Sequence, residues 1–304
     1  MLFKNLILYR LPENWSVPAA ELEEALGRRP LQPCSGFDMQ TRGFVATGYE
    51  ERLLHTQGRH HLLALGGGRN FKTDTVINQQ AKERAVELAA QQGYPVGRRQ
   101  MRELKARVTD ELRSRALTSR RTTHAWLNLP QRWLAVNTSS APRAEELVET
   151  LRETLGSFAV QPVASLNSPA GAMATWLTQG RVPGRFSIDQ DLELQAVDGG
   201  GATIRYVNHP LDSAEIRSHL GAGKTPTRLG LVWNERIAFM LQQNLYIKRV
   251  RFLDVYKDDN AQGENPQEQF DIDFALMTGE LSQLLEELLA GLGGEETAPV
   301  RQAA

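Results

Sequence analysis

The sequence predicts an α+β protein with mixed or antiparallel sheets, a protruding helical hairpin and an amphipathic helix near the C-terminus. Three observations support this fold class. Apolar runs of strand length alternate with helical patterns, two helical stretches follow one another between residues 76 and 116, and six leucines recur at helical spacing from Leu281 to Leu292. With 304 residues, 41% of them hydrophobic, the chain can bury a sizeable core.

A chain of this length is expected to hold about two domains. We assign residues 1–75, continued by 125–165, to a first α+β part, and residues 166–304 to a second α+β part that includes the C-terminal helix. Residues 76–124 form the hairpin, which we treat as a separate arm.

Strands are expected where a short apolar run is bounded by turn residues. In the first half they cover residues 2–9, 43–47, 61–65, 132–137 and 158–163. A helix follows the first strand, with Ser16 as its cap, Pro18 in its first turn and Gly27 beyond its end. The glycines at 66–68 lack dinucleotide-binding spacing, and we expect a loop there that ends the third strand.

Helical periodicity covers residues 76–92 and 98–116, and the turn residues Gly93, Pro95 and Gly97 between them predict a hairpin. A further helix is expected from about residue 141 to 155. Gly156 stops it. Because strands flank this helix, the segment is expected to form a β-α-β unit.

The second half repeats this mixture of elements. Asp212 and Glu215 have the spacing of a capping box, which predicts a helix that ends near Gly221. The final helix carries the leucine stripe, which is expected to serve either the core or a dimer interface. Glycines at 291, 293 and 294 end this helix. The expected strands cover residues 201–207, 228–233, 236–241 and 246–252, and a polar loop is expected at 257–269.

Charge is segregated along a chain whose formal net charge is only −1. Residues 98–121 hold nine basic side chains against three acidic ones, whereas residues 254–296 hold twelve acidic side chains and one basic one. A basic stripe of this kind favours a polyanion as partner, and nucleic acid is the commonest. The alternative is a solvated helix face, which is the usual explanation of an isolated charge run.

The basic residues of the second hairpin helix lie beside an apolar stripe. At about 100° per residue, Arg98, Arg102, Lys105 and Arg113 fall within roughly an 80° arc. The stripe next to them consists of Met101, Leu104, Val108 and Leu112. One edge of the helix is therefore expected to pack and the adjacent edge to face a ligand. The DNA-binding residues that we predict are Arg98, Arg99, Arg102, Lys105, Arg113, Arg120 and Arg121, with Arg69, Lys72 and Lys224 as extensions.

Several segments resemble one protein family. They are FKNLILYRL near the N-terminus, AEELVETLRETLGS in the centre, EIRSHLGAGK with IKRVRF after it, and the terminal FDIDFALMTGELSQLLEELLAGLGGE. In this order they resemble the recombination-associated protein RdgC of proteobacteria over nearly the whole chain. The resemblance implies an α+β homodimer that forms a ring around double-stranded DNA, binds it with little sequence preference and restrains recombination by RecA.

The resemblance also implies roles for particular residues. The hairpin would close the ring against its partner, with Leu112 and Leu117 at the dimer interface, although relatives often carry an aromatic residue where this chain has Leu117. Val207, Asn208 and His209 stand where relatives often have a basic pair followed by Gln, so this chain departs from the pattern at a DNA contact that the resemblance implies.

Other patterns are interpreted as structural. The turn at 221–225 ends like a P-loop but lacks the first glycine and follows a helix. His55, His60 and His61 have no metal-ligand spacing, so surface or packing roles are favoured. Cys34 is expected to be a small buried residue. The tryptophans expected in the core are Trp126, Trp133, Trp176 and Trp233.

The sequence therefore predicts a DNA-binding homodimer without catalytic activity or cofactor. The short apolar run at the N-terminus, interrupted by Lys4 and Arg10, favours a soluble, cytoplasmic and nucleoid-associated protein over a secreted or membrane one. Single-stranded DNA stays open as a second ligand. Two alternatives also stay open: a nucleotide-dependent enzyme that uses the 221–225 turn, and an adaptor that binds RecA without affinity for DNA.

Overall fold

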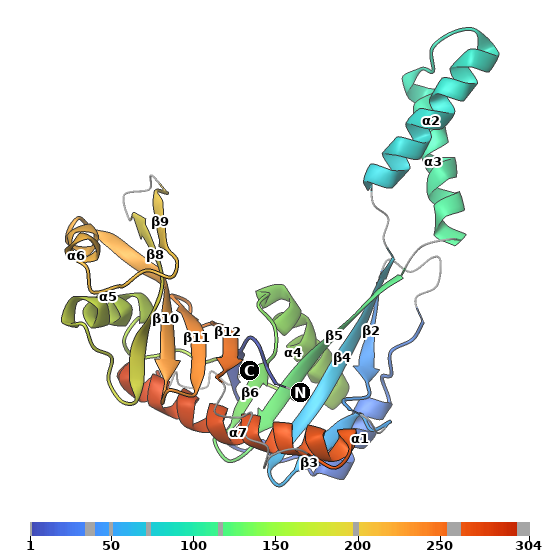
Figure 1. The fold of residues 1–304 in the computed structure, drawn as a ribbon. Coiled ribbons are helices and arrows are strands. Elements are labelled where there is room, and N and C mark those ends of the chain that lie inside the picture. Colours follow the sequence, from blue (N-terminus) through green and yellow to red (C-terminus); the bar gives the residue numbers. More distant parts are fainter. Residues whose placement is uncertain are drawn as a thin grey trace, which may run out of the picture. The chain divides into compact units, whose positions relative to one another are not determined.

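The computed structural model describes residues 2–33, 40–48, 51–70, 74–114, 118–196, 201–253 and 263–296. Within these residues the chain forms two sheets and seven helices, and every strand pair of described register is antiparallel (Figure 1). The predicted α+β class is confirmed, as are the helical hairpin and the C-terminal helix.

The first sheet has seven strands in the order β2-β4-β5-β6-β1-β7, with β3 paired to β4. Their bounds are β1 Ile7–Arg10, β2 Gln40–Val45, β3 Leu54–Gln57, β4 His60–Asn70, β5 Thr118–Asn128, β6 Trp133–Val136 and β7 Gln161–Pro162. Strand β1 is antiparallel to both β6 and β7, so these two neighbours run parallel to each other. Helix α4 (Ala141–Leu155) connects them, and the predicted β-α-β unit is therefore split by β1.

The second sheet has the order β12-β11-β10-β8-β9. Its strands are β8 Phe186–Ala196, β9 Thr203–Tyr206, β10 Lys224–Trp233, β11 Ile237–Gln242 and β12 Ile247–Phe252. Helices α5 (Pro169–Gln179) and α6 (Ala214–Gly221) both contact β10. Leu6 and Ile247 exchange two backbone hydrogen bonds of 2.8 and 3.1 Å. The segment before β1 therefore pairs with β12 and joins the two sheets.

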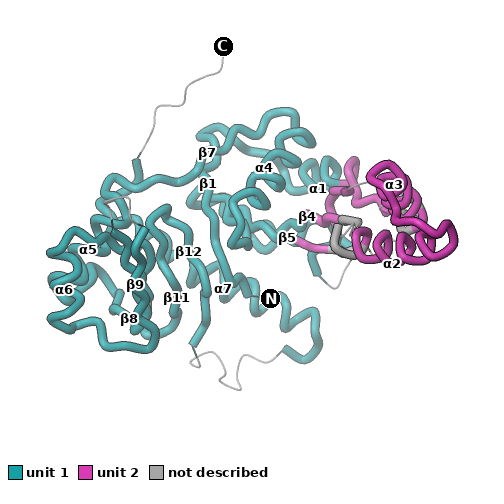
Figure 2. The backbone as a smooth tube through the Cα atoms, turned by 90° about the horizontal axis from the view of Figure 1, so that it is seen from above, with its two compact units in different colours: residues 1–26, 46–64, 123–304 teal, residues 27–45, 65–122 magenta. Residues whose placement is uncertain are grey.

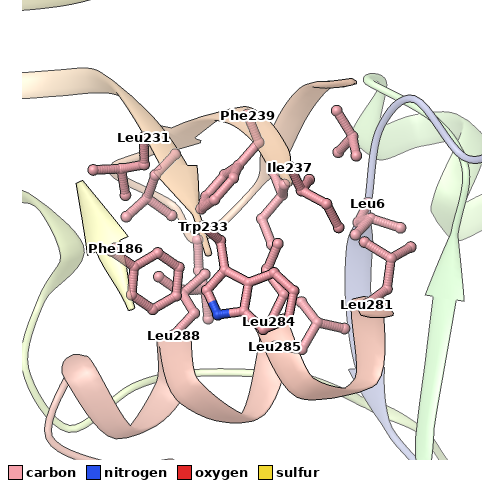
Figure 3. Packing of buried hydrophobic residues seen from close by; sticks show 14 of the residues in the cluster. Leu6, Phe186, Leu231, Trp233, Ile237, Phe239, Leu281, Leu284, Leu285 and Leu288 are labelled. Carbon is pink, nitrogen blue, oxygen red and sulfur yellow. The ribbon is translucent and has the colours of Figure 1, made fainter. Parts of the chain in front are cut away.

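Helix α7 (Pro266–Gly291) runs along both sheets (Figure 1). Asn265 caps it by accepting hydrogen bonds from the amides of Gln267 and Glu268. All six leucines of the stripe are buried in the hydrophobic core. Figure 3 shows four of them, Leu281, Leu284, Leu285 and Leu288, on the side of α7 that faces Trp233 and its neighbours. The stripe therefore serves the chain's own core, and the predicted core role of all four tryptophans is confirmed as well.

The chain divides into two compact units (Figure 2). One comprises residues 1–26, 46–64 and 123–304, and the other comprises residues 27–45 and 65–122. The second unit contains α2 (Asp74–Gln92), α3 (Arg98–Ser114), β2 and the ends of β4 and β5 that adjoin the hairpin. The domain boundaries expected from the sequence stay a prediction.

The prediction of a loop at glycines 66–68 is wrong, because β4 continues through these residues to Asn70. A Cβ atom at Gly66 would lie 2.6 Å from Cγ1 of Val45 and 2.7 Å from Cδ2 of Leu31. Glycine is needed here for close packing inside the sheet, whereas a turn was inferred from the glycines alone.

Several predicted boundaries are also corrected. Helix α1 (Ala19–Gly27) includes Gly27 and begins three residues after Ser16, so Ser16 is not its cap. Ser213, not Asp212, caps α6 by accepting from the amide of Ile216. Of the loop predicted at 257–269, residues 266–269 belong to α7, and residues 257–262 lie outside the described parts. The strand expected at 2–9 pairs as a strand only from Ile7.

Candidate nucleic-acid interface

Helices α2 and α3 pack on each other through a small apolar contact. Ile77 and Ala81 of α2 are buried against Val108 of α3, and Met101 packs at the edge of this group. An ion pair adds to the contact, with Arg84 Nη2 2.5 Å from Glu111 Oε2. The two helices of the hairpin are therefore held together by an apolar contact and an ion pair of their own.

Two glutamines fix the turn of the hairpin. The Gln92 amide nitrogen donates to the carbonyl oxygen of Tyr94 at 3.0 Å, and its oxygen accepts from Gln100 Nε2 at 3.0 Å. The oxygen of Gln100 accepts in turn from the backbone amide of Gly97 at 3.2 Å. These bonds determine where α3 begins, and Arg98 and Arg99 therefore stand in its first turn.

In the part of α3 whose side chains the structure describes, the predicted separation of an apolar edge from a basic edge is confirmed. Val108 is fully buried, and Met101 and Leu104 are half-buried. On the remaining surface the exposed cations are Arg98, Arg99, Arg102, Lys105 and Arg107. The first four of these were predicted as DNA contacts. Arg107 belongs to the same charge run but lies about 140° or more from Arg98, Arg102 and Lys105 around the helix. It therefore falls outside the arc of about 80° that the predicted DNA contacts occupy.

Most of this positive charge is not compensated within the protein. Arg99 is 3.3 Å from Glu103 but its side chain is 94% exposed, so that pair is weak. Among the described side chains, no carboxylate forms an ion pair with Arg98, Arg102, Lys105 or Arg107. The first turn of α3 holds no acidic residue, although the positive end of the helix dipole favours one. This uncompensated positive charge lowers the stability of α3 as an isolated helix and favours the binding of an external anion.

The other predicted contacts are placed less completely. Arg69 lies in β4, Leu112 and Arg113 lie in α3, and Arg120 lies in β5, but the structure does not describe their side chains. Lys72 and Leu117 lie outside the described residues. Arg121 is half-buried, with its Nε 3.2 Å from where a Cβ of Gly67 would stand, and it has interactions within the protein. Lys224 begins β10 in the other unit.

The three histidines considered as metal ligands take part in packing. His55 lies edge-to-face against Phe270 and Phe274, with ring centroids at 4.9 and 5.0 Å. His60 accepts a hydrogen bond from the Trp126 indole, and His61 contacts Thr56. Burial lowers the pKa of His60 and of His61, and the neighbouring His60 lowers that of His61 further. In the described parts of the chain, no group of three His, Cys, Asp or Glu side chains is arranged to hold a metal ion.

The glycine turn at 221–225 follows the end of α6 and leads into β10. Gly223 has a φ of +84° and its amide donates to the carbonyl of Leu220 at 3.0 Å, as in a helix-ending turn. The prediction of a helix-ending turn is confirmed. Cys34 lies outside the described residues. No helix in the described ranges is long and apolar enough to cross a membrane.

The fold and this site define a class: α+β proteins with two sheets in which a cationic helical hairpin connects two strands of one sheet. A family model described as "Putative exonuclease, RdgC" matches residues 1–295. The chain is 44% identical over 299 residues to the Recombination-associated protein RdgC of Dechloromonas aromatica (strain RCB), covering 97% of this chain and 98% of that one. The chain belongs to the RdgC family.

Two further relatives carry the same name. The protein of Janthinobacterium sp. (strain Marseille) is 40% identical over 296 residues, covering 97% of this chain and 99% of the relative. That of Burkholderia orbicola (strain MC0-3) is 40% identical over 305 residues, covering 100% and 99%. The similarity thus extends over nearly the full length of each protein, and it associates this chain with recombination.

Proposed function

We propose that the protein binds the phosphate backbone of double-stranded DNA, with little preference for sequence, through the exposed cations of α3. The observation that carries the proposal is the set Arg98, Arg102 and Lys105, which is exposed on one side of α3 and has no ion-pair partner among the described side chains. Arginine suits this role because its planar donors can engage two phosphate oxygens at once. Phosphate contacts carry little sequence information.

The biological role that we propose is the restraint of RecA-dependent recombination by occupancy of DNA, in the cytoplasm and at the nucleoid. The recombination-associated name of the relatives supports it. A ring-shaped homodimer closed by the hairpins would keep the protein on long DNA. The exposed Tyr94 beside the hairpin turn (58% exposed) suits an apolar contact with a second copy. The leucine stripe of α7 lends this dimer no support, since the core takes it up.

We further propose that binding involves no catalysis, although the family model's description includes an exonuclease. The glycine turn ends a helix, whereas a P-loop leads from a strand into a helix, so the turn does not favour nucleotide hydrolysis. A RecA-binding adaptor without DNA affinity would leave the charge of α3 without a role. Both alternatives are open to the experiment below.

The test is fluorescence anisotropy of the purified protein with two labelled duplexes of unrelated sequence across a salt series. We expect similar affinities for both duplexes and a steep fall with salt, because released counterions drive the binding. Electrophoresis of the same samples after incubation with Mg²⁺ or Mn²⁺, and phosphate release from ATP, check for catalysis. Affinity that appears only with RecA present, shortened DNA, or phosphate release that Lys224→Ala abolishes would each contradict the proposal.

A further inference from the structure

Lys248 lies on the same face of the second sheet as Arg228. Strand register pairs Lys248 of β12 with Met240 of β11, and Met240 with Gly230 of β10. Directly paired residues share a face of a sheet, as do residues two apart along one strand, so Lys248 and Arg228 project from one face with β11 between them. The side chain of Lys248 is half-buried there.

An irregularity in β12 brings a further cation to this face. Ala238 pairs with Arg251 and Met240 with Lys248, so one residue of β11 stands opposite two of β12. Such a bulge re-aims side chains, and Arg249 has a φ of +53° there. Lys248 and Arg249 consequently line one groove, although they are adjacent in the chain.

The groove has a volume of about 480 Å³ and more positive than negative charge. The charged side chains that line it are the cations Arg205, Arg228, Lys248 and Arg249 and the carboxylates Asp191 and Glu193. Arg249 lies 3.7 Å from Asp191. In the described part of the chain, no carboxylate forms an ion pair with Lys248, so its amine is not held by a carboxylate and can react with a molecule in the groove.

Glu193 positions two of the arginines. Its Oε2 accepts from Arg205 Nε at 2.6 Å, and its Oε1 lies 3.4 Å from Arg228 Nε. Both contacts use Nε, so the terminal nitrogens of the two guanidinium groups remain as donors for a small oxyanion. Planar guanidinium donors match the geometry of a phosphate group.

The surroundings of Lys248 favour its neutral amine. Burial, and secondarily the charge of Arg228, lower the pKa of Lys248 below its usual 10.5. A larger share of the side chain is therefore unprotonated at a given pH than in an exposed lysine. The unprotonated amine is the nucleophilic form, and a neighbouring cation is one way in which a protein activates a lysine.

We propose that Lys248 is a site of covalent acylation, and that the acyl donor is an acyl phosphate whose phosphate group is held by the guanidinium groups of the groove. The inference goes beyond the proposed function and does not depend on it, because neither the donor nor the product involves α3. It assigns the groove a small reactive anion as its ligand.

The reaction is a transfer of the acyl group without oxidation or reduction. The lone pair of Lys248 Nζ attacks the carbonyl carbon of the donor and forms a C–N bond. The bond from that carbon to the bridging oxygen breaks, inorganic phosphate leaves with the electron pair, and the proton of the attacking amine passes to water. Guanidinium donors stabilise the charge that develops on the departing phosphate. The product is a neutral amide, which leaves the groove three cations.

The first test incubates the full-length protein with isotopically labelled acetyl phosphate and follows the acetylation of each lysine by peptide mass spectrometry. The reference is Lys82, an exposed lysine of the other compact unit. We expect Lys248 to react roughly tenfold faster than Lys82, because activation of the amine and binding of the donor act together. Equal rates at the two lysines overturn the proposal.

A second reagent separates the two contributions. Acetic anhydride acylates amines but carries no phosphate group. We expect the preference for Lys248 over Lys82 to be smaller with the anhydride than with acetyl phosphate. Added inorganic phosphate should slow the reaction of Lys248 with acetyl phosphate and leave Lys82 unaffected. The same preference with both reagents, together with no effect of inorganic phosphate, overturns the acyl phosphate as donor.

Arg228→Gln tests the neighbour of the amine. It removes a donor to the phosphate and also the like charge beside Lys248, so the rate with acetyl phosphate should fall by roughly tenfold. The matched control is Arg217→Gln, which removes an exposed cation of the same unit that does not line the groove. Arg249→Gln, at a side chain that is 74% exposed, repeats the test should Arg228→Gln fail to fold. An unchanged rate in a folded Arg228→Gln protein contradicts the proposal.

The pH profile distinguishes activation of the amine from a structural role of Arg228. Arginines and carboxylates titrate outside the range of about pH 7 to 10. Burial and the hydrogen bond to Glu215 raise the pKa of Tyr206, which also lines the groove, above its usual 10.0. The rate at Lys248 should therefore level off at a lower pH than the rate at Lys82, and Arg228→Gln should move that point upward. Identical profiles for Lys248 in the wild type and in Arg228→Gln overturn the activation by Arg228.

Discussion

The indole of Trp233 and the carboxylate of Glu287 join the second sheet to α7. Trp233 Nε1 donates to Glu287 Oε2 at 3.1 Å, and the guanidinium of Arg185 lies over the same indole ring, 4.6 Å from its centroid. Arg185 also pairs with Glu287. One carboxylate therefore satisfies the polar atom of a fully buried tryptophan and holds the cation that covers it.

Glu287→Gln is expected to destabilise the protein at neutral pH by about 1–2 kcal/mol, because the charge-assisted bonds become neutral ones. Hydrogen bonding from Arg185, and secondarily from Trp233, lowers the pKa of Glu287 below 4.5. A carboxyl with a lowered folded-state pKa stabilises the fold above its unfolded pKa and loses this contribution as pH falls through the folded value. Urea unfolding should show the difference between variant and wild type shrinking below pH 4.5. A constant difference would contradict this account.

Leu284→Ala tests the position of the leucine stripe. Leu284 is fully buried in the core that α7 forms with the second sheet, so truncation should cost about 2–5 kcal/mol. The oligomeric state, measured by light scattering, should not change, because the stripe faces the chain's own core. Leu166→Ala, at a side chain that is 64% exposed, is the control and should be nearly neutral. A folded Leu284→Ala protein with an altered mass would place the stripe at an interface.

Gly43→Ala tests the close approach of β2 to the segment before it. A Cβ atom at Gly43 would lie 2.4 Å from the backbone nitrogen of Leu31, and Leu31 donates to the carbonyl of Phe44 at 3.0 Å. Because backbone cannot rotate away as a side chain can, we expect a loss of roughly 1–3 kcal/mol. Gly97→Ala, where nothing lies within 4 Å, should be neutral or slightly stabilising in the same thermal unfolding assay. Equal stability of the two variants would contradict the packing.

The elements that the sequence predicts well have their own local signals. Helix α4 begins and ends where its periodicity and Gly156 indicated, and the leucine stripe identified α7. The glycines at 66–68 misled because a glycine signals a turn and a close contact equally, and only the neighbouring strand distinguishes them. Strands β5 and β8 were not predicted. Strand β5 begins with seven polar residues, and the alternation of β8 is interrupted at residues 189–191, so pairing across the sheet defines both strands more than composition does.

The charged surfaces of the protein also differ in how far the sequence reveals them. The basic edge of α3 is readable because helical geometry relates residues close in sequence. The row of paired charges Arg205, Glu193 and Arg228 on the second sheet was not predicted, because these residues come from three strands whose register no local pattern reveals. The bulge in β12 at Arg249, whose φ is +53°, is likewise a property of pairing between β11 and β12.

The measurement that most directly tests the central claim is the salt dependence of DNA binding by a variant with Arg98, Arg102, Lys105 and Arg113 all changed to Gln. Glutamine forms helices nearly as well as arginine, so circular dichroism should show a folded hairpin. The charge-matched control changes four exposed arginines of the other unit to Gln: Arg59, Arg143, Arg181 and Arg217.

If each of the four α3 cations neutralises one phosphate, the slope of log affinity against log salt should fall by roughly 3 to 4 units, equally for duplexes of unrelated sequence. The control should keep the wild-type slope. A folded α3 variant that binds DNA with an unchanged slope would contradict the account and make the basic edge of α3 a solvated surface.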